Sequence, residues 1–312
     1  MLQMKVQECV VSDKVVSADG DDPSLWDGIV VPSDVKERLL HHSLLALRVR
    51  PVLPFAATAL HGLCTLYGPP GTGKTTLAMG LPAELAPFIG GRRVRRIEVN
   101  PHGLMSAEHG QSQQRVHELL ADHVPALASD GTPTVVVLDE VESMAVARSA
   151  ASLAANPADV HRATDAVLTA LDHNAVRYPH LLFVATSNFT SALDEAFLSR
   201  TDAAIHVPLP GADALQLIIR QTLEALGELT PALRDLAASP RLAEVAAHAE
   251  GLDGRRARKV VFEALCQRLE AVLDPGQLTE FDLTAAARAA VQATRESRSS
   301  VEDAEEDSDV AA

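Results

Sequence analysis

A glycine-rich segment limits the possible folds of this chain more than any other feature. Residues 68–75 read GPPGTGKT, which fits the pattern GxxxxGK[ST], and they follow a short β-type run, Leu63 to Tyr67. A segment with helical character comes next. Glycines allow backbone N–H groups to wrap phosphates, and the N-terminus of a following helix favours negative charge. We therefore expect a nucleotide-binding loop that joins a strand to a helix.

The expected phosphate-binding residues are those of the loop and the first turn of the helix. They are Gly68, Pro69, Pro70, Gly71, Thr72, Gly73, Lys74, Thr75 and Thr76. Lys74 would reach the β- and γ-phosphates of ATP, and the Thr75 hydroxyl would bind Mg²⁺. ATP and Mg²⁺ are thus the expected cofactors.

The order of apolar runs predicts an α/β fold followed by a helical domain. Five β-type runs alternate with helical patterns, which predicts a five-stranded parallel sheet between helices. The runs are Leu63 to Tyr67, Val94 to Val99, Thr134 to Asp139, Leu181 to Thr186 and Ala203 to Val207. After Pro210 the chain becomes rich in Ala and Leu, with helical periodicity. We predict a weakly ordered segment at 1–25, a nucleotide-binding domain at 26–210, a small helical lid at 211–295 and an acidic disordered tail at 296–312.

Charge and composition disfavour several classes of protein. The formal net charge is -15, so a phosphate backbone would be repelled overall. The basic run Arg92, Arg93, Arg95 and Arg96 lacks interleaved aromatic residues, and we weigh a solvated edge or subunit contact above a nucleic-acid site. The sequence has three scattered cysteines and no apolar run long enough to span a membrane, so we expect a cytoplasmic protein.

Two carboxylates end the apolar strand 135–138. At the edge of the sheet where nucleotides bind, Asp139 would hold Mg²⁺ through water, and Glu140 would act as the general base that polarises the attacking water. A protein that only binds nucleotide does not need both groups. The alternative is an accidental acidic pair at the end of a strand.

Three further polar residues are candidates for catalysis. Asn188 follows the run 181–186 and could orient the attacking water, although Asn is also common in plain turns. Arg200 could project into a neighbouring subunit as an arginine finger, or could pair internally with Asp194 or Asp202. Arg255 begins a helix in the lid and could reach the γ-phosphate; Arg256 and Arg258 compete for this role.

These motifs, in this order, resemble the AAA+ ATPase family over about residues 26–272. Three segments also resemble the pachytene-checkpoint, Trip-thirteen-like group: residues 139–144 (DEVESM), 165–172 (DAVLTALD) and 186–189 (TSNF). The segments 25–27 and 251–259 are similar to the same group.

The resemblance implies a ring-forming homo-hexamer that uses ATP to engage and partly unfold a HORMA-domain protein, switching it from a closed to an open state. In a bacterial member it would act as a negative regulator of antiphage signalling by cyclic oligonucleotides. The alternative function is an AAA+ ATPase that acts on nucleic acid or loads a helicase.

The chain departs from the group in two places. Eukaryotic members carry a sizeable N-terminal substrate-binding domain, whereas only 67 residues precede Gly68 here, and part of these belong to the ATPase fold. Substrate capture would then differ or be reduced. The expected pore loop, residues 103–110, lacks an aromatic residue. Contact with substrate would then come from Leu104, Met105, Glu108 and His109, unless this is an ordinary surface loop.

Overall fold

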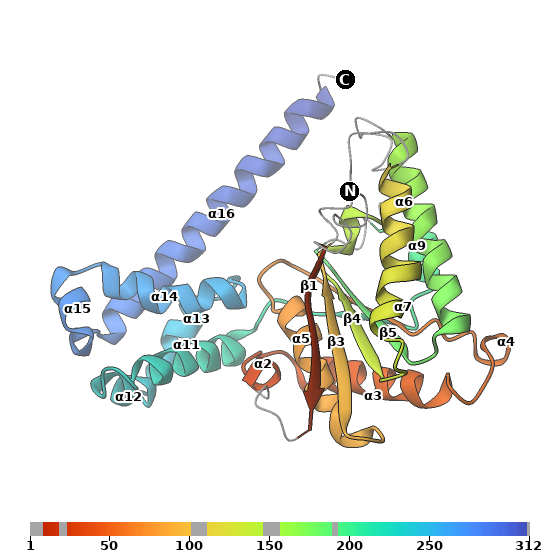
Figure 1. Ribbon diagram of the computed structural model, residues 1–312. Helices are drawn as coiled ribbons and strands as arrows, with labels where there is room; N and C mark the ends of the chain where they lie inside the picture. The colour runs from red at the N-terminus through yellow and green to blue at the C-terminus, as the bar shows by residue number, and fades with distance from the viewer. Residues whose placement is uncertain (1–8, 19–23, 101–110, 146–156, 189–192, 311–312) are drawn as a thin grey trace. The chain divides into compact units, whose positions relative to one another are not determined.

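The computed structural model describes residues 9–18, 24–100, 111–145, 157–188 and 193–310 (Figure 1). The chain divides into two compact units. Unit 1 comprises residues 1–69 and 74–207, and unit 2 comprises residues 70–73 and 208–312. The division after residue 207 lies close to the expected start of the helical lid.

Unit 1 is built on a mostly parallel sheet. Within the described residues the sheet has six strands, in the order β1-β3-β4-β5-β2-β6. They are β1 (Val10–Ser17), β2 (Leu63–Tyr67), β3 (Arg93–Val99), β4 (Thr134–Leu138), β5 (Leu181–Ser187) and β6 (Ala203–His206). All five predicted runs form strands, and their pairings with one another are parallel. The predicted α/β class is confirmed.

The sixth strand lies in a segment that we expected to be weakly ordered. Residues Val10–Ser17 form β1, which pairs antiparallel with β3 along one edge of the sheet. Arg95 of β3 contributes to this edge, because its guanidinium contacts the carboxylates of Asp13 and Asp130 at 3.0 Å each. Arg96 is buried and donates a hydrogen bond to the carbonyl oxygen of Met79 at 2.9 Å. Two members of the basic run therefore have structural contacts within the subunit.

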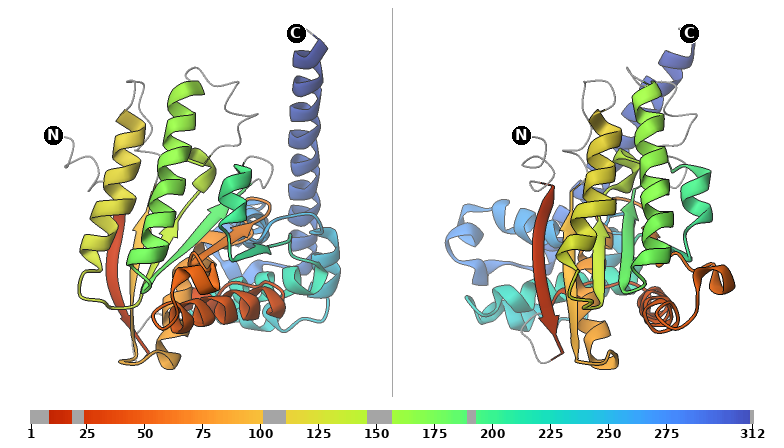
Figure 2. Two further views of the ribbon diagram at one scale, coloured as in Figure 1. Left: turned by 90° about the vertical axis from the view of Figure 1, so that its right-hand side faces the viewer. Right: turned by 45° about the vertical axis from the view of Figure 1, so that its right-hand side comes forward.

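Helices cover both faces of the sheet, and each face has its own hydrophobic core (Figure 2). One face packs against α6 (Gln111–His117), η3 (Glu118–His123), α7 (Val124–Leu127) and α9 (Pro157–Arg177). The other packs against α2 (Ser24–Asp27), α3 (Ser33–Val49) and α5 (Lys74–Leu85). Successive residues of β4 alternate between the two cores, with Val136 in the first and Val137 in the second. This double burial explains why the strand has an unbroken apolar sequence.

The remaining elements of unit 1 are short. They are α4 (Phe55–Thr58), η1 (Ala86–Phe88), η4 (Val141–Ser143) and α10 (Glu195–Ser199).

Unit 2 contains helices and no strand in its described part, as predicted for the lid. Its elements are α11 (Ala212–Leu226), α12 (Ala232–Ala237), α13 (Leu242–His248), α14 (Gly254–Cys266), α15 (Leu269–Leu273), η6 (Pro275–Gln277) and α16 (Glu280–Val310). The last helix continues to Val310, where we expected a disordered tail from residue 296. A helix anchored by the buried residues Leu283 and Ala287 can be extended by Ala, Glu and Arg, which are good helix formers.

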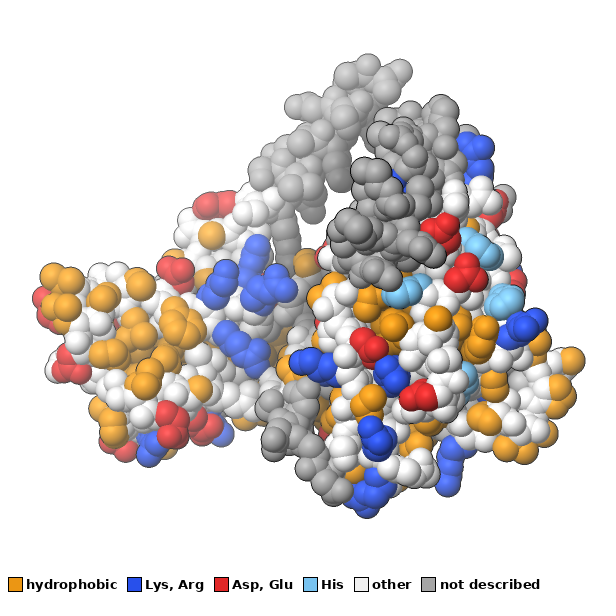
Figure 3. Space-filling view, in the orientation of Figure 1, with side chains coloured by type: hydrophobic (Ala, Val, Ile, Leu, Met, Phe, Trp, Pro, Cys, Tyr) orange, Lys and Arg blue, Asp and Glu red, His pale blue; other side chains and the backbone are white. Residues whose placement is uncertain are grey.

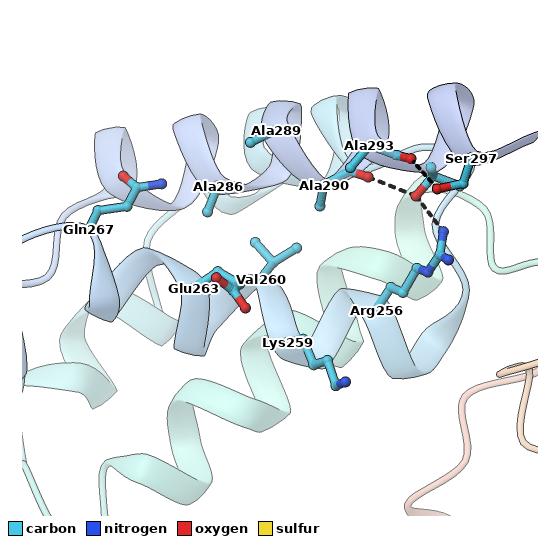
Figure 4. A pocket seen from close by; sticks show the side chains of 11 residues that line it. Arg256, Lys259, Val260, Glu263, Gln267, Ala286, Ala289, Ala290, Ala293 and Ser297 are labelled. Carbon is cyan, nitrogen blue, oxygen red and sulfur yellow. Dashed lines mark hydrogen bonds between the residues drawn. The ribbon is translucent and has the colours of Figure 1, made fainter. Parts of the chain in front are cut away.

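Basic side chains gather over α14 in the space-filling view (Figure 3). A groove of about 450 Å³ lies between α14 and α16 and is lined mainly by small side chains of α16 (Figure 4). Among the described residues, no helix combines the length and apolarity that crossing a membrane requires.

A single carboxylate fixes the entry into β2. Asp202 accepts hydrogen bonds from the backbone N–H groups of His61, Gly62 and Leu63 at 2.9, 2.7 and 3.1 Å. Its own N–H donates to the carbonyl oxygen of Leu63 at 2.8 Å. The residue before β6 thus holds the start of the strand that leads into the glycine-rich loop.

We predict that Asp202→Ala lowers the free energy of unfolding by about 2 to 3 kcal/mol, because three backbone donors lose a charged acceptor. Chemical denaturation followed by circular dichroism measures this change. Asp235→Ala in the helix α12 serves as the control, because Asp235 does not hold the start of a strand. It should leave the midpoint of denaturation almost unchanged. A loss no greater than that of the control would contradict the role of Asp202.

Candidate nucleotide site

The glycine-rich loop has the backbone conformations that only glycine adopts readily. Gly68, Gly71 and Gly73 have φ values of +146°, +77° and +93°. A Cβ atom at Gly68 would also collide with the carbonyl oxygen of Val207. The loop leaves β2 at Tyr67 and enters α5 at Lys74, as the sequence predicts.

Lys74 carries a buried ammonium group at the first residue of α5. Its side chain is 6% exposed, and Nζ donates to the carbonyl oxygens of Gly68 and Pro69 at 2.8 Å each. It also donates to Oδ1 of Asn188 at 3.0 Å. The loop therefore surrounds a positive charge, which is the arrangement that a phosphate-binding lysine requires.

Oxygen atoms suited to Mg²⁺ meet beside this lysine. The hydroxyl of Thr75 donates to Oδ1 of Asp139 at 2.6 Å, and the hydroxyl of Thr186 donates to the same oxygen at 2.6 Å. Hydroxyl and carboxylate oxygens are the donors that Mg²⁺ prefers. Thr75 and Asp139, which were predicted together as the metal-binding pair, thus lie in direct contact, and their chemistry fits the ion.

Thr186 was not predicted, although the pairing of the strands accounts for it. Leu138 of β4 lies opposite Ala185 of β5, so the next residues, Asp139 and Thr186, are neighbours. The signal that could have identified Thr186 is a hydroxyl residue directly after Ala185, the last residue of β5 that pairs with β4.

Glu140 adopts a left-handed conformation directly after β4, with φ +50° and ψ 54°. A non-glycine residue in this region carries strain, and such residues cluster at functional sites. Its backbone N–H donates to the hydroxyl of Thr186 at 3.1 Å. Its Oε1 accepts from Nδ2 of Asn188 over a longer distance of 3.4 Å. Asn188 therefore contacts both Lys74 and Glu140 through its side chain.

The sheet order explains why these groups converge. Strand β5 lies between β2 and β4, so the carboxyl ends of all three strands meet at one edge of the sheet. The loop after β2 supplies Lys74, and the residues after β4 and β5 supply the acidic pair and Asn188. This is the edge at which open α/β sheets bind ligands. Glu142, for which the sequence suggested no role, also reaches this edge.

Arg200 lies elsewhere in unit 1 and forms an internal ion pair. Its Nε and Nη2 donate to the two carboxylate oxygens of Asp172 at 2.7 and 2.8 Å, and Nη1 donates to the carbonyl oxygen of Ala196 at 2.9 Å. The hydrogen bond from Arg200 is the largest cause of the lowered pKa of Asp172. Nε2 of His61 approaches the same carboxylate at 3.3 Å.

The internal partner of Arg200 is therefore not one of the two aspartates we considered. Asp194 caps α10 by accepting a hydrogen bond from the N–H of Ala196 at 2.9 Å, and Asp202 binds the backbone before β2. Asp172 comes from α9, which sequence reasoning could not place next to Arg200.

Arg200 and the glycine-rich loop lie at opposite ends of β2. The segment after Arg200 pairs with Leu63 at the start of β2, whereas the loop follows Tyr67 at its end. A strand of five residues is roughly 16 Å long. Arg200 therefore lies far from the nucleotide loop of its own subunit.

In unit 2, the backbone of the loop tip meets the start of α14. The N–H of Arg255 donates to the carbonyl oxygen of Gly71 at 3.2 Å, and the side chain of Arg255 is exposed. The side chain of Arg256 instead donates to the hydroxyl of Thr294 in α16. Asp253 caps the helix through the N–H of Arg256 at 2.9 Å. Arg255 is thus placed next to the loop by its backbone.

The expected pore-loop residues lie outside the described residues. These are Leu104, Met105, Glu108 and His109.

The sequence matches known proteins over most of its length. Residues 64–209 match the model of the ATPase family associated with various cellular activities (AAA). CD-NTase-associated protein 6 of Pseudomonas aeruginosa is 45% identical over 86% of this chain and 88% of that protein. The pachytene checkpoint protein 2 homologue of Xenopus tropicalis is 30% identical over 84% of this chain and 66% of that protein.

Two solved structures share the fold. The structure of PCH-2 from C. elegans has a TM-score of 0.71 and 24% identity, and the match covers 92% of this chain and 76% of that one. A chain of the E. coli MS115-1 HORMA:CdnC:Trip13 complex has a TM-score of 0.66 and 17% identity over 90% of this chain and 95% of that one. The site geometry, the family model and the close relative agree, and the chain belongs to the AAA ATPase family, within the group of CD-NTase-associated protein 6 and the pachytene checkpoint protein 2 homologues.

Proposed function

We propose that this protein hydrolyses ATP in order to remodel a HORMA-domain protein, which it engages, partly unfolds and switches from a closed to an open state. The observation that carries the proposal is the convergence of Lys74, Asp139 and Glu140 at one sheet edge in a chain 45% identical to a CD-NTase-associated protein. A structural neighbour was solved in a complex with a HORMA protein and CdnC. The same proposal gives the protein a role as a negative regulator of antiphage signalling by cyclic oligonucleotides, in the cytoplasm.

The residues of the site have separate tasks in this proposal. The loop 68–76 and Lys74 bind the phosphates of ATP, while Thr75 and Asp139 hold Mg²⁺. When bound, Mg²⁺ neutralises the charge that develops on the phosphate oxygens. Glu140 takes the proton of the attacking water, and Asn188 orients that water. Arg255, whose N–H binds the loop at Gly71, supplies a cation from the lid.

A ring of six copies would complete the site. Arg200 lies at the end of β2 opposite the nucleotide loop, so it cannot serve its own subunit without a large rearrangement. This position supports the proposal that it acts on the nucleotide of a neighbour. Action on nucleic acid is less well supported, because Arg95 and Arg96 of the basic run have partners within the subunit.

Addition of a HORMA-domain protein encoded in the same genome should raise ATP turnover several-fold, and turnover should disappear when EDTA removes Mg²⁺. Phosphate release measures the rate, and an unrelated folded protein of similar size serves as the control. An equal response to the control protein would argue against a HORMA substrate.

Glu140→Gln should bind ATP but turn it over at least about 100-fold more slowly than wild type, because it lacks the general base. Phosphate release measures this rate as well. Wild-type turnover in this variant would remove Glu140 from the mechanism.

Arg200→Ala should lose about 10³-fold in turnover, because an arginine finger supplied in trans is worth at least this much in other phosphoryl-transfer enzymes. Its affinity for ATP, measured by fluorescence titration, should stay within about threefold of wild type. Mixing Arg200→Ala with Glu140→Gln subunits should restore part of the activity only if one subunit completes the site of the next. Unchanged turnover in Arg200→Ala, or no recovery of activity in the mixed rings, would contradict a finger supplied in trans.

The ion pair of Asp172 and Arg200 has a defined pH dependence. The pKa of Asp172 is lowered in the fold, so its contribution to stability is complete above the unfolded value of about 4 and is lost as the pH falls through the folded value. Asp172→Asn should therefore destabilise the protein at pH 7, by about 1 kcal/mol or less because the carboxylate is 47% exposed. The difference should shrink below pH 4. Urea unfolding at pH 7, 5 and 3.5 tests this, and a difference at pH 3.5 as large as that at pH 7 would refute it.

A further inference from the structure

Glu142 makes a contact that its place in the sequence does not explain. It lies in the 3₁₀ turn η4, two residues after Glu140. Its Oε1 accepts a hydrogen bond from the backbone N–H of Asn188 at 3.1 Å. Because β5 ends at Ser187, the N–H of Asn188 is the first one beyond the strand. Glu142 supplies the acceptor at the point where the sheet stops.

The second oxygen of Glu142 takes no part in the contact with Asn188. Oε2 is buried and, among the described residues, has no hydrogen-bond partner. Burying a carboxylate oxygen without a donor costs stability, and each such group in a folded protein calls for an explanation. The hydrogen bond from Asn188 uses Oε1 alone, so any role of this contact lies with that oxygen.

The contact of Glu142 belongs to a pair with a common spacing. The N–H of Glu140 donates to the Thr186 hydroxyl at 3.1 Å, and two residues further along both segments the N–H of Asn188 donates to Glu142. The direction of donation is reversed between the two contacts. Together they connect the segment after β4 to the end of β5, beyond the last paired residues of these two strands, Leu138 and Ala185. The geometry of Asn188 relative to Glu140 therefore depends on them.

The side chain of Asn188 lies between Lys74 and Glu140, two charged groups of the site. Its Oδ1 accepts from Nζ of Lys74 at 3.0 Å, and its Nδ2 donates to Oε1 of Glu140 at 3.4 Å. A shift of the Asn188 backbone would move both contacts at once. A misplacement of about 1 Å in a catalytic group can cost on the order of 10²-fold in rate.

We propose that Glu142 is a positioning residue, which fixes the backbone of Asn188 so that its amide spans Lys74 and Glu140. The inference rests on the proposed ATPase function and adds to it a residue that acts through Asn188. What Glu142 contributes is an acceptor oxygen at a fixed distance from the end of β5. The negative charge of Glu142 is not required for this task.

The test compares Glu142→Ala with Glu142→Gln in the full chain. Glu142→Ala, which removes the acceptor, should lower kcat about 10- to 100-fold, while the Kd for ATP stays within about threefold of wild type. Glu142→Gln keeps an amide oxygen at the same place and should retain kcat within about threefold. Glu118→Ala is the matched control, because Glu118 lies in η3 and its buried Oε2 also has no partner within the described part of the chain. It should leave kcat unchanged.

A double-mutant cycle with Asn188→Ala separates positioning from a general effect on folding. If Glu142 acts through Asn188, Glu142→Ala should cause no further loss of kcat in the Asn188→Ala background. Additive losses, or a Glu142→Gln variant as slow as Glu142→Ala, would overturn the proposal. If Glu142→Ala does not fold, as judged by circular dichroism, Glu142→Met replaces it. This variant also lacks the acceptor oxygen, so the same loss of kcat is expected. A wild-type protein without ATPase activity would instead refute the proposed function.

Discussion

The buried ammonium of Lys74 is the constraint on which the rest of the site depends. A charge that is 6% exposed must be surrounded by oxygen atoms, and here the carbonyls of Gly68 and Pro69 and the amide of Asn188 supply them. The first two acceptors require a loop that folds back on the start of α5, which in turn requires glycines with positive φ. The third requires β5 to lie next to β2. Loop conformation and strand order are thus tied to a single charge, which a bound phosphate would neutralise more completely.

Much of this arrangement could be predicted because it depends on local sequence. The loop, the five apolar runs and the acidic pair after β4 follow from short motifs and from alternation between buried faces. What could not be predicted depends on pairing between distant segments. Strand β1 acquires its order from β3, and the hydroxyl of Thr186 meets Asp139 only because β4 and β5 pair in one register. The partner of Arg200 was missed for the same reason, since Asp172 belongs to a separate helix.

The helical continuation of α16 shows a different limit of sequence reasoning. Low apolar content after residue 296 predicts that this segment cannot form a core of its own. It does not predict that the segment is disordered, because a helix that already has a buried anchor extends at little cost in good helix formers. Composition describes what a segment can bury, whereas its conformation also depends on the element to which it is attached.

The ion pair between Arg200 and Asp172 is compatible with a role for Arg200 in a neighbouring site when magnitudes are compared. The side chains are 23% and 47% exposed, and pairs with this exposure contribute about 1 kcal/mol or less. A finger that accelerates phosphoryl transfer 10³-fold stabilises the transition state by about 4 kcal/mol. The gain exceeds the cost of leaving Asp172, so the internal pair would not prevent Arg200 from engaging a nucleotide. The bidentate contact limits the conformations of a long side chain, and this would reduce the entropy lost if Arg200 engages the nucleotide of a neighbouring subunit, as proposed.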